Sequence, residues 1–189
     1  MRRYTRALSH FGRLLEHPWL KPFIGMDKVN VLDICAGAGI GGVALARVML
    51  ERGVDVDLTL VDVREEDLRI GAEWGSEVLG REIEYWVMDS LEVYRLGKRF
   101  NIVLMYGNSS PHFDPWGLIR LYASICGCLL DNGILVMQEC DRRYSIFFLA
   151  GYQRILTEKA TLDELISVSY THLRAHETEA DLVCRLLLE

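Results

Sequence analysis

The 189-residue sequence predicts an α/β protein with a central, mostly parallel sheet and helices on both faces. One reason is that continuously apolar segments of strand length alternate along the chain with segments of helical periodicity. The other is that the last two predicted strands are separated only by the polar turn "HETE". Because so short a turn joins antiparallel strands, we expect a seven-stranded sheet with an antiparallel C-terminal strand.

The first half of the chain predicts three strands and two helices. The sequence "KVNVLDI" (28–34) predicts a buried strand, and residues 40–53 predict the helix that follows it. Residues 56–63 predict a second strand. Residues 64–80 predict a helix whose first turn is rich in acids, as the helix dipole favours. Residues 82–88 predict a third strand.

The second half continues the alternation. Residues 114–130 predict a helix, with Asp114 as its N-cap and Pro115 in its first turn. The other predicted elements are strands over 100–106 and over 133–139 after the turn Asp131-Asn132-Gly133, a helix over 144–159, and terminal strands over 163–175 and 180–189.

Composition excludes several classes of protein. Half of the residues are apolar, and the net charge of −6 opposes general binding to nucleic acid. The start of the chain lacks the apolar stretch of a signal peptide, and no run is long enough to span a bilayer. The five cysteines show neither a CxxC pair nor a zinc spacing, so we expect free thiols in a reducing cytoplasm. They are Cys35, Cys126, Cys128, Cys140 and Cys184.

A glycine pattern follows the first predicted strand. Gly37, Gly39 and Gly42 fit G-x-G-x-x-G before a helix, a pattern that is weak by itself and also fits a turn without a ligand. Asp62 ends the second strand about 20 residues later, where a carboxylate can accept both hydroxyls of an adenosine ribose. The alternative for Asp62 is a solvated acid at a strand end. Together the two features predict a nucleoside site.

Two further acids bear on the choice of cofactor. Asp89 can accept a proton from the exocyclic amine of an adenine whose ring Val63 and Met88 cover, although it also fits a helix N-cap. Asp33 ends the first strand directly before the glycines, where it would repel the pyrophosphate of a dinucleotide. A cationic sulfonium meets no such repulsion. Asp33 therefore favours S-adenosylmethionine over a nicotinamide dinucleotide.

These motifs, in this order, resemble those of class I S-adenosylmethionine-dependent methyltransferases. "VLDICAGAGIG" resembles the first motif, "LTLVDV" the acidic second, "WVMDS" the third, "FNIVLMYGNSSPHF" the fourth, and "LLDNGILVMQE" the strand that follows. The resemblance covers residues 28–188 and implies a Rossmann-like fold. Cys35 departs from it, because the family usually has its first glycine at this position.

The resemblance also implies a cofactor site. Asp33, Gly37 and Gly39 would line the methionine end of the cofactor, Asp62 its ribose and Asp89 its adenine. The full expected set is Asp33, Cys35, Ala36, Gly37, Gly39, Asp62, Val63, Met88, Asp89, Ser90 and Tyr106.

The methyl acceptor is less well defined. The sequence "YGNSSPHF" (106–113) lacks the Asn/Asp-Pro-Pro-aromatic sequence of members that methylate exocyclic amines or glutamine, and it resembles the GNS-x-x-H of members acting on small amines. We therefore expect Asn108 to orient the nucleophile and His112 to accept a proton. The alternative is that Asn108 lies in a turn and His112 merely precedes a helix cap. Glu139 and Asp141, after the fifth strand, are weaker candidates.

The N-terminal segment is basic. Residues 2–23 carry five Lys or Arg and one acid, with apolar residues at helical spacing. In this fold a leading helix often covers the cofactor, so residues 1–25 are expected to form a lid in which Tyr4, Arg6 and Arg13 meet the cofactor or a substrate carboxylate. The alternative is a packed helix with a solvated basic face.

The interpretation is one methyltransferase domain over 1–189, with its core at 28–189, that acts on a small molecule by in-line methyl transfer. The alternatives are an RNA or tRNA methyltransferase using the basic segment, a cofactor-binding subunit without activity of its own, and a nicotinamide oxidoreductase, which Asp33 opposes. No metal is expected, because His172 and His176 lack a third ligand. No membrane partner is expected, and the oligomeric state stays open.

Overall fold

A computed structural model describes residues 2–139, 159–160 and 165–166. The chain divides into two compact units. The first unit comprises residues 1–107 and 120–138, and the second comprises 108–119 and 139–189. The predicted single domain over 1–189, with its lid at 1–25, stays a prediction, and each unit is treated separately below.

The first unit is built on a five-stranded, fully parallel sheet in the order β3-β2-β1-β4-β5. The strand order reverses between β1 and β4, and ligands of such sheets bind at the carboxyl ends of the strands beside this reversal. The strands are β1 (Lys28–Ile34), β2 (Asp55–Asp62), β3 (Glu84–Val87), β4 (Phe100–Met105) and β5 (Leu129–Met137).

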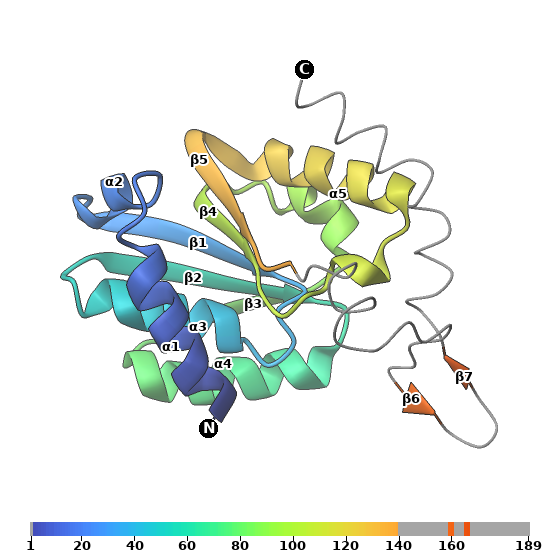
Figure 1. Ribbon diagram of the computed structural model, residues 1–189, viewed down its shortest axis with the longest axis horizontal. Coiled ribbons are helices and arrows are strands. Elements are labelled where there is room, and N and C mark those ends of the chain that lie inside the picture. Colours follow the sequence, from blue (N-terminus) through green and yellow to red (C-terminus); the bar gives the residue numbers. More distant parts are fainter. Residues whose placement is uncertain (1, 140–158, 161–164, 167–189) are drawn as a thin grey trace, which may run out of the picture. The chain divides into compact units, whose positions relative to one another are not determined.

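Helices connect the strands (Figure 1). The α3 and α4 crossovers run toward β3, whereas the α5 crossover runs from β4 to β5 in the opposite direction. Because such crossovers are right-handed, the two directions place helices on opposite faces of the sheet. The helices are α1 (Arg2–Leu14), α2 (Lys21–Ile24), α3 (Ile40–Leu50), α4 (Glu65–Leu79) and α5 (Pro115–Cys128), with the 3-10 helices η1 (Ser90–Leu96) and η2 (Ser110–His112).

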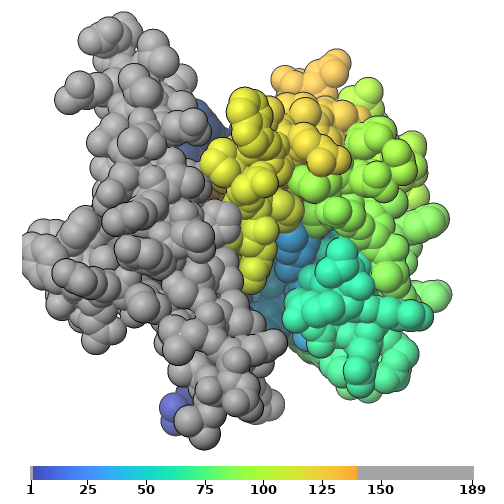
Figure 2. Space-filling model, turned by 90° about the vertical axis from the view of Figure 1, so that its right-hand side faces the viewer, coloured from blue at the N-terminus to red at the C-terminus, as the bar shows by residue number. Residues whose placement is uncertain are grey.

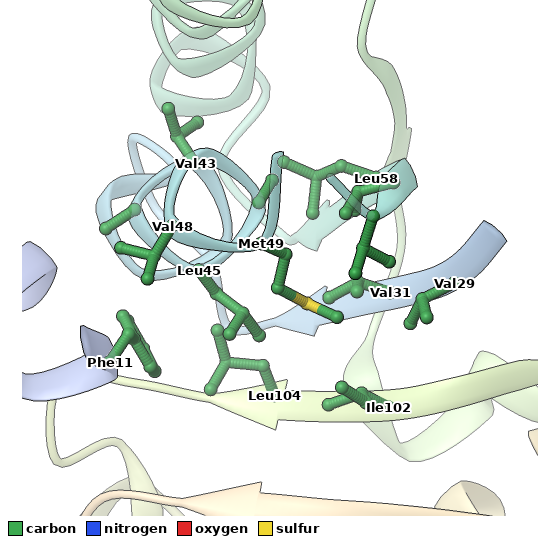
Figure 3. Packing of buried hydrophobic residues seen from close by; sticks show 14 of the residues in the cluster. Phe11, Val29, Val31, Val43, Leu45, Val48, Met49, Leu58, Ile102 and Leu104 are labelled. Atoms are coloured by element: carbon green, nitrogen blue, oxygen red, sulfur yellow. The ribbon is translucent and has the colours of Figure 1, made fainter. Parts of the chain in front are cut away.

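The core of the first unit lies where α3 packs on β1 and β4. Figure 3 shows Leu45 and Met49 of α3 directed toward Val31 of β1 and Leu104 of β4, with Phe11 of α1 beside them. All of these side chains are almost fully buried. α1 therefore belongs to the hydrophobic core through one of its faces, as its apolar spacing predicts.

The predicted mostly parallel α/β class is confirmed, and the described strand ends agree with the sequence to within two residues except at β5. The expected turn Asp131-Asn132-Gly133 lies inside β5, where the pairing shifts from Phe100 with Leu129 to Ile102 with Ile134. A Cβ on Gly133 would lie 2.9 Å from the Phe100 carbonyl oxygen. The turn-forming residues thus make an irregularity within a strand instead of ending one.

The C-terminal expectations fall largely outside the described residues. Of the predicted helix 144–159, only Lys159 is among the described residues. Lys159 lies in a strand, so the prediction that it ends a helix is wrong. β6 (Lys159–Ala160) and β7 (Leu165–Ile166) form a separate antiparallel pair in the second unit. The predicted strand 180–189 is not among the described residues, and the described central sheet has five strands instead of seven. In the described part of the chain, every helix is too short or too polar to cross a bilayer.

Gly71 and Gly12 offer a matched test of how α4 packs. A Cβ on Gly71 of α4 would lie 2.8 Å from the carbonyl carbon of Ala38, whereas a Cβ on Gly12 of α1 would meet no atom of the described residues within 4 Å. We expect Gly71→Ala to lower the free energy of unfolding by about 1–3 kcal/mol through overpacking. Gly12→Ala should raise it by about 0.5–1 kcal/mol, because alanine is the better helix former.

Urea unfolding of the two variants and the parent chain would measure both changes. Equal effects of the two substitutions would contradict the close packing of α4 on the Ala38 backbone.

Candidate functional site

The candidate site lies at the carboxyl ends of β1, β2 and β4. The register places Asp33 of β1 beside Leu60 of β2 and Leu104 of β4, so the residues that follow these strands emerge at the same edge. This is the edge beside the strand-order reversal, where the sequence predicts the glycines and acids to meet.

The glycine loop, residues 35–39, joins β1 to α3. Gly37 and Gly39 adopt left-handed φ values of 52° and 69°, which explains why glycines stand there. The loop is tied to the end of β2, because the Ala36 N–H donates to the Val61 carbonyl. A Cβ on Gly39 would also lie 2.9 Å from a Leu60 methyl group. The two glycines therefore meet both a conformational and a packing requirement.

Cys35 occupies the position where the resembled family usually has glycine, and the backbone keeps the glycine-like conformation. Its φ is 51°, in a region that costs an ordinary residue about 1–2 kcal/mol. The Cys35 thiol lies 3.3 Å from the Ser90 hydroxyl. Burial raises the pKa of this thiol to about 11, so it stays protonated at neutral pH. Two of the expected cofactor residues, Cys35 and Ser90, are thus in contact.

α4 holds the glycine loop from outside. The Trp74 indole N–H donates to the Ala38 carbonyl at 2.9 Å. The ring of Tyr4, from α1, packs edge-on against Trp74 with the ring centroids 5.3 Å apart. Tyr4 was expected as a possible cofactor contact, and its described aromatic contact is to Trp74. No sequence pattern predicted the contact of Trp74 with the glycine loop, because an isolated tryptophan on a helix fits ordinary core packing equally well.

Asp62 joins the glycine loop to β2. It is 4% exposed, and its Oδ2 accepts a hydrogen bond from the Gly37 N–H at 2.7 Å. Its Oδ1 accepts from the Arg64 backbone N–H at 3.0 Å. Burial by itself would raise the pKa of Asp62, but the hydrogen bonds from Arg64 and Gly37 outweigh it and hold the pKa below its usual value. Asp62 is therefore a carboxylate at neutral pH.

The Arg64 side chain lies against Asp62, a contact that sequence reasoning missed. Its Nε lies 3.1 Å from Asp62 Oδ1 and its Nη2 3.4 Å from Asp62 Oδ2. Asp67, in the first turn of α4, holds Nη1 at 2.8 Å. A Cβ on Gly37 would lie 3.1 Å from Arg64 Nη2. The guanidinium thus covers the glycine loop at Gly37. The contact could have been predicted from the sequence, because a basic residue stands two positions after an acid at the end of a strand.

Asp33 is buried beneath the loop. It is 1% exposed, and its Oδ2 accepts from the Gly42 N–H at 2.7 Å, whereas its Oδ1 has no hydrogen-bond partner among the described residues. A Cβ on Gly42 would lie 2.9 Å from Oδ2, which explains the third glycine of the pattern. Burial raises the pKa of Asp33 to about 7.

The adenine-side candidates follow β2 and β3. The Met88 N–H donates to the Asp62 carbonyl, which places Met88 beside the end of β2. Val63 is 66% exposed, so its apolar side chain is open to a ligand. Asp89 caps η1, because its Oδ1 accepts from the Leu91 N–H at 2.9 Å. The N-cap interpretation of Asp89 is confirmed. Asp89 is exposed and belongs to the part of the chain that is drawn green in Figure 2.

Tyr106 follows β4 and lies against the first turn of α3. A Cβ on Gly41 would lie 2.6 Å from the Tyr106 Cβ, so this position accepts only glycine without a shift. The Tyr106 hydroxyl lies 3.1 Å from Nδ1 of His10 in α1. Sequence reasoning included Tyr106 but missed His10. The position of His10 on the polar side of a helix with apolar periodicity could have indicated it.

Asn108 and His112 belong to the second unit. Asn108 adopts a left-handed φ of 62°, which asparagine tolerates better than most residues, and His112 ends η2. Asp114 caps α5 as predicted, since its Oδ1 accepts from the Gly117 N–H. The catalytic roles of Asn108 and His112 stay predictions. Of the weaker candidates, Glu139 also belongs to the second unit.

Several remaining candidates are settled only in part. Arg6 and Arg13 are exposed on α1. Asp141, His172 and His176 lie outside the described residues. Within the described residues, no group of three or more His, Cys, Asp and Glu side chains is arranged to hold a metal ion.

Comparisons with known proteins bear on the fold. No protein-family model and no curated protein matches the sequence. The chain is similar in structure to an S-adenosylmethionine-dependent methyltransferase from Clostridium acetobutylicum, with a TM-score of 0.60 and 15% identity over 77% of this chain and 54% of that one. It is also similar to a ribosomal protein L11 methylase from Lactobacillus delbrueckii, with a TM-score of 0.51 and 14% identity over 81% and 72% of the two chains.

A third similar structure is a TehB-like methyltransferase from Corynebacterium glutamicum, with a TM-score of 0.50 and 18% identity over 67% of this chain and 60% of that one. The chain has the Rossmann-like fold of S-adenosylmethionine-dependent methyltransferases, as its motifs predict. It spans 36–54% of the length of several of the structures that it matches.

The raised pKa of Asp33 predicts how stability depends on pH. The folded-state pKa of about 7 exceeds the unfolded value of about 3.9, so between these values only the folded state holds the proton. The free energy of unfolding should therefore fall as pH rises through this window. The amide side chain of Asp33→Asn cannot ionise, and its oxygen can still accept the hydrogen bond from the Gly42 N–H. Its stability relative to the parent should rise by more than about 1 kcal/mol between pH 5 and pH 8.

Urea unfolding at the two pH values would measure this trend, with Asp57→Asn, at an exposed acid, as the control. A parallel pH profile for the parent and Asp33→Asn would contradict the protonation of Asp33 in the folded state.

Proposed function

We propose that this protein is a class I S-adenosylmethionine-dependent methyltransferase. The observation that carries the proposal is the Asp62 carboxylate, which is ionised, bonded to the Gly37 N–H of the glycine loop, and placed at the carboxyl edge of a β3-β2-β1-β4-β5 sheet. A carboxylate in this position suits the two hydroxyls of a ribose. The fold supports the proposal, because the similar structures include several proteins described as methyltransferases.

The residues fit this cofactor better than a dinucleotide. Asp33 lies directly beneath the glycine loop, and its Oδ1 is buried without a hydrogen-bond partner among the described residues. A cation bound near Asp33 would favour its ionised form, whereas two phosphates would oppose it. At Gly37 the only atom of the described residues near an added Cβ is the end of the Arg64 side chain, which can move away. The loop can therefore be approached by a ligand once Arg64 yields.

In this proposal different residues of the first unit bind different parts of the cofactor. Asp62 accepts the ribose hydroxyls, Val63 and Met88 cover the adenine, and Asp89 accepts from its amine with the oxygen that does not cap η1. The cofactor supplies the electrophilic methyl group, and the protein supplies orientation and excludes water. The other expected contacts are Asp33, Cys35, Ala36, Gly37, Gly39, Ser90 and Tyr106.

We further propose a small-molecule acceptor, which Asn108 orients and from which His112 takes a proton. The proteins of similar fold do not indicate which acceptor is used, because they include both a ribosomal protein L11 methylase and a glycopeptide N-methyltransferase. An RNA or tRNA acceptor, and a cofactor-binding subunit without activity of its own, are the competing proposals. A cytoplasmic location, expected from the free cysteines, stays a prediction.

The cofactor proposal predicts opposite effects from the two partners of one ion pair. Asp62→Ala should weaken S-adenosylhomocysteine binding more than tenfold, because the ribose hydroxyls lose their acceptor. Arg64→Ala should tighten binding by about three- to tenfold, because the guanidinium no longer competes for Asp62 and such a pair contributes about 1 kcal/mol. Calorimetric titration would measure both affinities, and Arg69→Ala, at an exposed arginine of the same helix, should leave binding unchanged.

NADH in the same titrations tests the oxidoreductase alternative. Binding of NADH in place of S-adenosylhomocysteine would contradict the proposed cofactor, and unchanged affinity in Asp62→Ala would contradict the assignment of the ribose site.

His112 is tested by turnover. With an acceptor identified by screening, His112→Ala should lower kcat by about 10²–10⁴ near neutral pH without changing cofactor affinity, because a proton acceptor is lost. A kcat that stays at the parent value across the pH range would show that His112 is not a base.

A further inference from the structure

The α1 helix has two stripes with different chemistry. Tyr4, Ala7 and Phe11, at i, i+3 and i+7, pack into the first unit, and Ala7 and Phe11 are fully buried. A second stripe has the same spacing. Arg3, Arg6 and His10 each stand one position before a residue of the core stripe, and Arg13 continues the stripe at i+3 from His10. The helix contains four arginines and no acid. The core stripe explains why α1 packs where it does. This packing does not require the residues of the basic stripe.

The four arginines of α1 form no ion pair with any described residue. Elsewhere in the first unit, exposed arginines are commonly paired with acids. Those pairs involve Arg47, Arg52, Arg64, Arg69, Arg81 and Arg95. Among the described residues, the positive charge on α1 is therefore not neutralised by an acid, and such a charge attracts anions.

The basic stripe reaches Tyr106. The Tyr106 hydroxyl lies 3.1 Å from His10 Nδ1, and its ring packs against Phe11 with the centroids 5.2 Å apart. Burial raises the pKa of Tyr106, and the positive charges of Arg6 and Arg3 oppose this rise. Arg3 and Arg6 precede His10 at helical spacing, so they share the face of α1 from which His10 contacts the hydroxyl. Tyr106 stays protonated at neutral pH and can donate a hydrogen bond.

Tyr106 also connects this cluster to the candidate cofactor site. It follows β4 at the carboxyl edge of the sheet, and its side chain lies against Gly41 in the first turn of α3. The glycine loop leads directly into that turn. The cationic cluster and the loop therefore lie at the same edge, which is where an acceptor must approach a bound methyl donor.

We propose that Arg3, Arg6, His10 and Tyr106 bind the anionic oxyacid group, carboxylate or phosphate, of the methyl acceptor. This inference rests on the proposed methyltransferase function and names the acceptor class. Arg3 and Arg6 supply charge, and Tyr106 donates its O–H to the group. His10 contacts the same hydroxyl through Nδ1 at 3.1 Å and fixes the position of Tyr106. A small acceptor fits better than RNA, because the positive charge is confined to one helix of a chain whose net charge is −6.

The first test detects the anion site directly. Full-length protein with isotope-labelled histidine is saturated with S-adenosylhomocysteine and titrated with inorganic phosphate or with acetate at constant ionic strength. The His10 ring signal, assigned with His10→Gln, should shift and saturate. The double variant Arg3→Gln/Arg6→Gln should weaken this response at least tenfold, Arg3→Lys/Arg6→Lys should retain most of it, and Arg69→Gln should not change it.

The second test identifies the acceptor. Candidate acceptors are supplied as matched pairs, a carboxylic acid with its primary amide and a phosphate monoester with its parent alcohol, beside single-stranded RNA. Formation of S-adenosylhomocysteine should occur with acids or phosphates and not with their neutral partners, and the two pairs separate the two anions. Arg3→Gln/Arg6→Gln should raise KM at least tenfold with little change in kcat, and Tyr106→Phe should raise KM less.

The outcomes separate this inference from the proposed function. Binding of S-adenosylhomocysteine without a His10 response to either anion would overturn the anion site alone. Equal use of the neutral partners, or methylation of RNA only, would overturn the assignment of a small anionic acceptor. Failure of the parent and every variant to bind S-adenosylhomocysteine would overturn the proposed function, and the acceptor role with it. Circular dichroism and thermal unfolding confirm that each variant is folded.

Discussion

The hydrogen bond between Asp62 and the Gly37 N–H is the contact on which the rest of the candidate site depends. At 2.7 Å it joins the end of β2 to the glycine loop that follows β1. The same carboxylate holds Arg64, and Arg64 in turn contacts Asp67 at the start of α4. One acid thus organises two strand ends, a loop and a helix. In the proposed function a ribose binds the same carboxylate, so the proposed ligand and Arg64 would compete for its oxygens.

Asp33 shows a second constraint, in which packing and electrostatics oppose each other. Its position fixes the first turn of α3, because only a glycine at 42 lets the backbone N–H approach Oδ2. The same burial leaves Oδ1 without a partner among the described residues and raises the pKa of the carboxyl to about 7. A cation near the loop would relieve this cost. The unfavourable burial of Asp33 is therefore consistent with a site that is complete only with a cationic ligand.

α1 illustrates how one amphipathic helix serves both stability and recognition. Ala7 and Phe11 place it on the core, and this fixes where the arginines of its other stripe lie. His10 belongs to this second stripe and reaches Tyr106 at the sheet edge. The prediction of a basic N-terminal helix was correct, but its aromatic Tyr4 contacts Trp74 of α4 and so supports the glycine loop. The proposed acceptor side and the proposed cofactor side of the site therefore share α1 as a structural support.

The sequence alone determined the α/β class, the described strand positions, the glycine loop and the acids at strand ends, because apolar period, glycine spacing and strand-end position are local properties. It also identified Asp114 as a cap, since capping involves residues three positions apart. It could not place Arg64 on Asp62, Trp74 on Ala38 or His10 on Tyr106, because each contact joins side chains whose approach depends on packing between elements. It misjudged residues 131–133 for the same reason. Their turn-forming character is local, but pairing with β4 keeps them inside a strand.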